Sequence, residues 1–101
     1  MKTALHSFEM VGEKSGGFLG FGGTKPTFYM YNDGFGWTEG KDLKFVPYTG
    51  VKQLKYSKYY STVSVIHSET KKIALLNVQI FEAIWTSFAS KNTFSFKLTA
   101  E

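Results

Sequence analysis

The 101-residue chain contains no cysteine, no arginine, only two prolines and only two histidines. Without cysteine it has no disulfide, no thiolate nucleophile and no cysteine-ligated zinc. His6 and His67 belong to no HxH or HxxxH pair, so we expect no metal site. Without arginine the chain lacks the planar guanidinium that grips guanine or phosphate through two hydrogen bonds. This absence makes nucleic acid an unlikely partner.

Long apolar runs are also missing. No stretch approaches the ~18 apolar residues of a membrane span. The segment from Met1 to Glu9 lacks the apolar run of a secretory signal. These two features predict a cytoplasmic protein.

Aromatic side chains, in contrast, are plentiful: ten Phe, six Tyr and two Trp. Large rings bury much area per residue, so even a short chain can build one hydrophobic core. The length suits a single domain over residues 1–101. The net charge is +4, and its excess lies between residues 44 and 72, where six lysines accompany one glutamate. Such a segment is attracted to anionic surfaces.

Short β-prone segments separated by turn signals occupy the first three quarters of the chain. Asn32-Asp33-Gly34 is a strong turn signal, because these residue types tolerate positive φ. Glu39-Gly40-Lys41-Asp42 and Tyr48-Thr49-Gly50 are further expected turns, and Pro47 ends a strand or places it at an edge. The expected strands cover residues 3–11, 27–31, 35–38, 43–46, 51–57, 60–66 and 71–76. Their spacing predicts a sandwich or barrel.

The hydrophobic period changes after residue 76. Asn77 is a good N-cap residue, and the apolar residues that follow recur at spacings of three and four: Val78, Phe81, Ile84, Trp85 and Phe88. We therefore expect one amphipathic helix over about 78–91, with Asn92 as its C′ residue. Residues 93–99 alternate polar with apolar side chains and predict a short extra strand in the tail 93–101.

Seven antiparallel strands followed by one helix resemble the pleckstrin-homology-like (PH-like) domains of bacteria. Three segments carry the likeness: Phe28–Trp37 resembles a strand-turn-strand of that family, Phe45–Leu54 its following Pro-aromatic turn and strand, and Lys71–Phe88 its last strand and helix. The resemblance implies an α+β, mostly β fold, an open barrel or two-sheet sandwich capped by the helix. Family members bind phosphoinositides, peptides or proteins and are generally not enzymes. In lipid-binding members, basic residues beside the first strand-to-strand loop hold the head group, and the matching positions are Lys14 and Lys25.

A glycine-rich loop over residues 16–25 is the most unusual local feature, since five of residues 16–23 are glycine. Phe18, Leu19 and Phe21 lie on it. One interpretation is an exposed apolar finger that binds a protein partner, a second copy or a membrane interface. The other is that the three side chains fold back and plug the barrel. The loop matches neither G-x-G-x-x-G nor a Walker motif, which disfavours nucleotide binding.

Lysines and tyrosines are interleaved in the second half of the chain: Lys52, Lys55, Lys58, Lys71 and Lys72 with Tyr56, Tyr59 and Tyr60. Such a set can bind anionic lipid or another anionic ligand, and single-stranded nucleic acid is a weaker reading because positions of odd spacing on a strand face opposite sides. Lysines on exposed strands also prevent edge-to-edge aggregation.

No catalytic constellation is recognisable, because His67, Ser68 and Glu69 are adjacent in sequence and adjacency does not orient a triad. We therefore expect no enzyme and no cofactor. Two hypotheses remain. The chain is an interaction module that binds a protein or itself through the glycine-rich loop or an open sheet edge. Alternatively, it binds an anionic membrane surface or another anionic ligand through the loop and the lysines Lys14, Lys25, Lys52, Lys55 and Lys58.

Overall fold

Two small sheets and one helix make up the described chain, which in the computed structural model comprises residues 3–11, 26–68 and 71–101. The elements are β1 (His6–Glu9), β2 (Thr27–Met30), β3 (Gly34–Glu39), β4 (Asp42–Pro47), the 3-10 turn η1 (Tyr48–Gly50), β5 (Val51–Ser57), β6 (Thr62–His67), β7 (Lys71–Leu75), α1 (Val78–Ala89) and β8 (Leu98–Ala100). The predicted α+β, mostly β class is confirmed.

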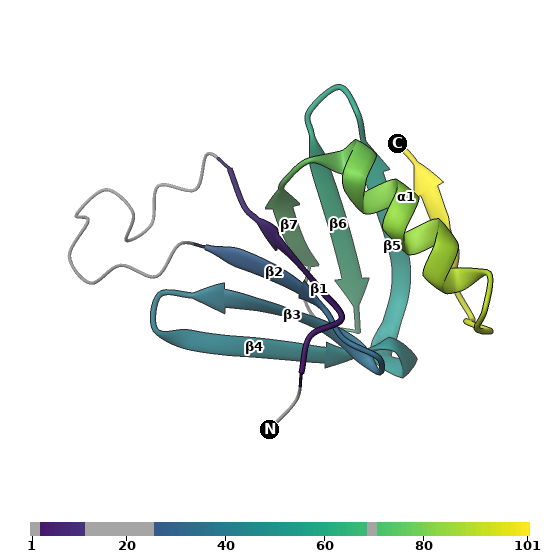
Figure 1. Ribbon diagram of the computed structural model, residues 1–101, viewed down its shortest axis with the longest axis horizontal. Coiled ribbons are helices and arrows are strands. Elements are labelled where there is room, and N and C mark those ends of the chain that lie inside the picture. The colour runs from purple at the N-terminus through teal and green to yellow at the C-terminus, as the bar shows by residue number, and fades with distance from the viewer. Residues whose placement is uncertain (1–2, 12–25, 69–70) are drawn as a thin grey trace.

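The first sheet has the strand order β1-β2-β3-β4 and the second has β7-β6-β5-β8 (Figure 1). Two-residue turns close the β2–β3 and β3–β4 hairpins of the first sheet. At the first turn the amide of Tyr31 donates to the carbonyl of Gly34 at 2.8 Å. At the second, Gly40 has a φ of +61°, which suits glycine at this position of a tight hairpin. Both turns lie where the sequence predicts them.

The core lies between the two sheets and α1, and aromatic rings dominate it. Phe81 of α1 contacts Phe8 of β1 and Phe28 of β2, with ring centroids 5.4 Å and 6.1 Å apart. Trp85, one helical turn later, contacts Phe35 of β3 at 5.2 Å. The apolar face expected from the spacing of three and four therefore packs against the sheets, with Val78, Phe81 and Trp85 buried.

The helix begins where the sequence predicts and ends earlier. The side chain of Asn77 accepts a hydrogen bond from the amide of Ile80 at 3.1 Å, as an N-cap residue does. The helix ends at Ala89 instead of residue 91, and Ser90 caps it in a right-handed helical conformation. Asn92 is not a left-handed C′ residue. Its side-chain amide instead donates to the carbonyl of Phe88 at 2.8 Å.

The extra strand is confirmed, but it is shorter than the predicted span of 93–99. Phe94 and Phe96 do not alternate in a ladder, because both rings stack on Trp85, with centroids 5.2 Å and 5.9 Å away. Only Leu98–Ala100 forms a strand, and it pairs with β5 in parallel. Parallel pairing follows because the chain returns past α1 in the direction of β5 (Figure 1).

Two other strands begin later than the sequence predicts. The first strand covers His6–Glu9, not 3–11, and the sixth begins at Thr62, not residue 60. Tyr59 and Tyr60 lie in the β5–β6 turn with 87% and 69% of their surface exposed. Ser61 follows with a φ of 55°, a conformation that interrupts a strand. Within the described ranges, no helix has both the length and the apolar character needed to cross a membrane.

Candidate binding site between the two sheets

A cleft of about 420 Å³ lies between the first sheet and the start of β7. We call it the lysine cleft, and its lining residues are Trp37, Glu39, Lys44, Phe45, His67, Lys71 and Lys72. Sheet register explains part of this set. Lys44 lies directly opposite Trp37 on the neighbouring strand, and Lys72 lies opposite Val65, so both lysines belong to the inward faces of their sheets.

Trp37 forms the apolar wall of the lysine cleft. Only 7% of its surface is exposed, and its ring stacks on Phe28 with centroids 6.4 Å apart. The ammonium of Lys72 lies 5.9 Å from the ring centroid, within the range of a cation–π interaction. Among the described residues, the indole Nε1–H of Trp37 is the one buried side-chain polar group without a hydrogen-bond partner. A buried donor left in this state costs about 1–3 kcal/mol.

The charge of the lysine cleft is mainly positive. Lys44, Lys71 and Lys72 oppose the single carboxylate of Glu39 in the lining. No described carboxylate forms an ion pair with any of these three lysines; the described ion pair joins Lys58 to Glu82 at 3.4 Å. The cleft therefore attracts a negatively charged group.

The outer edge of β4 borders the lysine cleft. β4 is the last strand of its sheet, and no described strand pairs with its outer edge. The two-residue turn makes Glu39 and Asp42 the hydrogen-bonded pair that closes the hairpin. Hydrogen-bonded and non-hydrogen-bonded pairs alternate along the ladder from this pair. The backbone N–H and C=O groups of Leu43 and Phe45 therefore point away from β3. Leu43 also exposes 58% of its surface.

The outward face beside this edge is aromatic. The rings of Tyr29, Tyr31 and Phe45 form a row across the sheet, with successive centroids 5.9 Å and 5.7 Å apart. Gly36 makes room for this row, since a Cβ at that position would lie 2.6 Å from the ring of Tyr31. β4 thus presents an apolar outer face, whereas its inner face carries Lys44 together with Asp42 and the buried Val46.

The edge of β7 is occupied at one end. The amide of Leu76 bonds to the carbonyl of Ser61, so the backbone groups of Lys71, Ile73 and Leu75 point away from β6. The amide of Val11, just after β1, donates to the carbonyl of Leu75 at 2.6 Å. Val11 therefore blocks part of this edge to a further strand.

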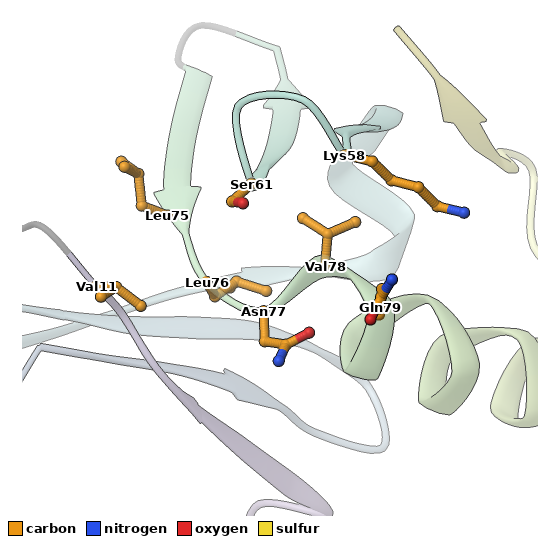
Figure 2. A pocket seen from close by; sticks show the side chains of 8 residues that line it. All are labelled: Val11, Lys58, Ser61, Leu75, Leu76, Asn77, Val78 and Gln79. Atoms are coloured by element: carbon orange, nitrogen blue, oxygen red, sulfur yellow. The ribbon is translucent and has the colours of Figure 1, made fainter.

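A second cleft, of about 490 Å³, lies where β1, the β5–β6 turn, β7 and α1 meet. Figure 2 shows its eight lining side chains, among which that of Lys58 extends away from the others. Asn77 already caps α1, and Leu76 and Val78 belong to the core. Its polar groups therefore serve the local structure, and we assign no ligand to it.

The site residues predicted from the sequence do not come together in one place. Phe18, Leu19, Phe21, Lys14 and Lys25 of the glycine-rich loop lie outside the described residues. The three remaining lysines do not share a cleft: Lys52 lies at the bulge in β5, Lys55 lies opposite Ser64, and Lys58 pairs with Glu82. Lys71 and Lys72 come together with Lys44, which the sequence did not single out. The sequence feature that could have identified Lys44 is the register of the β3–β4 hairpin, which places it opposite Trp37.

A separate group of ionisable side chains joins β5 to α1. Tyr56 donates its hydroxyl hydrogen bond to Glu82 at 2.8 Å, which lowers the pKa of Glu82 and raises that of Tyr56. His6 and His67 lie on different sheets. The described residues gather no group of three His, Asp or Glu side chains suited to a metal ion. No protein-family model, curated protein or solved structure matches this chain.

Proposed function

We propose that this chain is a non-catalytic interaction module that binds a protein segment, in extended conformation, along the outer edge of β4. The observation that carries this proposal is the edge of β4 at Leu43, with which no described strand pairs and which is bordered by exposed apolar surface. Natural proteins usually protect such edges, because their backbone groups pair readily with another chain. Addition of a strand would satisfy those groups, and the side chains beside the edge would provide specificity.

The resemblance to PH-like domains is part of the same proposal. It is supported by the chain order of four strands, three strands and one amphipathic helix that packs its aromatic face into the core. A scaffold of this kind presents rigid strand edges without a catalytic centre. The edge of β4 is favoured over that of β7 because Val11 already bonds to Leu75.

A selection from a displayed library of random short peptides tests the proposal. Peptides that bind the wild-type chain are expected to slow hydrogen exchange of the Leu43 amide, measured by NMR, because that amide becomes bonded to the added strand. Leu43→Pro removes the outward N–H and is expected to abolish binding. The matched control is Ile73→Pro, which removes an outward N–H from β7 and is expected to leave binding intact.

Folding of both proline variants is checked by circular dichroism. If Leu43→Pro does not fold, the selected peptides are instead methylated on alternate backbone nitrogens, and one of the two methylation registers is expected to abolish binding. The proposal is wrong if the library yields no binder, or if the binders protect amides of β7 and lose affinity only with Ile73→Pro.

A further inference from the structure

The two faces of β4 differ in chemistry along the same edge. Lys44 shares the inner face with Trp37, whereas Leu43 and Phe45 share the outer face. Side chains of a strand alternate between faces, so a strand added to β4 places every second side chain on the inner face, where Asp42, Lys44 and Val46 lie. Its remaining side chains lie beside Leu43 and Phe45, the outer-face residues of β4.

The inner side of this edge opens on the lysine cleft. Lys71 and Lys72 stand across the cleft from Lys44, and Glu39 is the single lining carboxylate. Side chains that enter from the added strand therefore meet an excess of positive charge. Opposite charges on a binding surface favour association and select the partner.

The unpaired indole of Trp37 provides a second, independent reason to expect a polar ligand here. Its Nε1–H is buried and has no acceptor among the described residues. The ammonium of Lys72 lies above the same ring at 5.9 Å from the centroid. An acceptor oxygen that reached this donor would satisfy it, whereas an apolar side chain would leave it unsatisfied.

From these observations we infer that the segment bound along β4 carries acidic side chains on the face turned to the lysine cleft and apolar side chains on the opposite face, beside Leu43 and Phe45. This inference rests on the proposed function and specifies the chemistry of the partner. The three lysines then do more than discourage aggregation. They attract acidic side chains of the partner that face the lysine cleft.

Four synthetic peptides of equal length test the inference. The first alternates glutamate with valine. The second has the same composition with the glutamates and valines in two blocks, the third replaces glutamate with glutamine, and the fourth replaces glutamate with lysine. Binding is followed by the indole N–H resonance of Trp37 and by hydrogen exchange of the Leu43 amide. The alternating glutamate peptide is expected to perturb both probes, and to bind at least about tenfold more tightly than the other three.

Charge reversal in the protein provides the matched variants. Lys44→Glu is expected to lower the affinity for the alternating glutamate peptide by about tenfold and to raise the affinity for the lysine peptide. Lys52→Glu makes the same change of net charge on β5, away from the lysine cleft, and is expected to leave both affinities almost unchanged. Raising the salt concentration is expected to weaken binding of the glutamate peptide, because exposed charges are screened within about 10 Å at 0.1 M.

The outcomes separate this inference from the proposed function. If the glutamine peptide protects the Leu43 amide as strongly as the glutamate peptide, strand addition stands and the acidic partner is wrong. Equal effects of Lys44→Glu and Lys52→Glu also contradict the inference. A third outcome is that no peptide binds, whereas the wild-type chain binds vesicles containing phosphatidylserine and the Lys44→Glu variant does not. In that case the lysine cleft recognises a lipid surface, and both proposals fail.

Discussion

Tyr48 connects more of the core than any local pattern suggests. Its ring contacts Phe35 at 5.0 Å and Phe94 at 5.1 Å, and its hydroxyl donates a hydrogen bond to the carbonyl of Tyr31. Burial, and secondarily the negative charge of Asp33, raise the pKa of Tyr48 above its ordinary value of 10.0. A buried phenol in this position therefore links the stability of the fold to alkaline pH.

Replacement of Tyr48 by phenylalanine is expected to lower the free energy of unfolding at neutral pH by about 1–3 kcal/mol, because the carbonyl of Tyr31 loses this donor. Because the pKa of Tyr48 is raised in the folded state, the contribution of this residue to the free energy of unfolding is complete below pH 10.0. That contribution declines as the pH rises from 10.0 toward the folded-state pKa. Urea unfolding at increasing pH is expected to show a smaller alkaline loss for Tyr48→Phe than for wild type. Tyr59→Phe, at an exposed ring, is the control and keeps the wild-type slope. An alkaline slope of Tyr48→Phe equal to that of wild type would contradict the assignment.

At the scale of elements, the β3–β4 hairpin depends on the close approach of its two strands. A Cβ at Gly34 would lie 2.4 Å from the carbonyl oxygen of Val46 and 2.5 Å from the ring of Phe45. A backbone oxygen has no rotamer by which to move away. Glycine at this position therefore maintains the register that places Lys44 opposite Trp37.

Gly34→Ala is expected to destabilise the protein by about 2 kcal/mol, as overpacking does, with the strain relieved by displacement of β4. Chemical denaturation measures the loss, and NMR shifts of Lys44 and Trp37 report the displacement. Gly50→Ala is the control, because its new Cβ meets only ordinary contacts at 3.7 Å or more. A Gly34→Ala variant as stable as wild type would show that the strands separate at no cost.

At the scale of the whole molecule, the C-terminal segment joins α1 to the second sheet. Phe96 exposes only 7% of its surface and stacks on Trp85 with centroids 5.9 Å apart. Beyond it β8 pairs with β5, and the amide of Glu101 donates to the carbonyl of Tyr56 at 2.8 Å. The segment thus covers both the aromatic core and one sheet edge.

Phe96→Ala is expected to cost about 3 kcal/mol, because it opens a cavity beside Trp85 and weakens the docking of β8. Thermal and urea unfolding measure the cost, and hydrogen exchange of the Tyr56 and Thr99 amides is expected to accelerate. Lys97→Ala, at the exposed neighbouring residue, is the control and is expected to change stability by less than about 0.5 kcal/mol. Unchanged exchange in Phe96→Ala would mean that β8 docks independently of the core.

The sequence determined the local elements of this protein. Asn32-Asp33-Gly34 and Gly40 set two hairpin turns, Asn77 set the start of α1, and the spacing of Phe81 and Trp85 set its buried face. These features depend on neighbours within a few residues, and their physics is contained in the local text. The helix ends at Ala89, slightly before the predicted end at about residue 91. The span of the last strand was wrong, because Phe94 and Phe96 pack on Trp85, a contact that no alternation in the tail reveals.

Only the tertiary structure decided where the lysines meet. Lys71 and Lys72 were grouped by sequence with Lys52, Lys55 and Lys58, yet the lysine cleft joins them with Lys44 instead. A side chain on a strand faces one side or the other according to register, and two sheets then bring together residues that are distant in the chain. Composition sets the number of charges. The packing of one sheet on the other sets which of them line the same cleft.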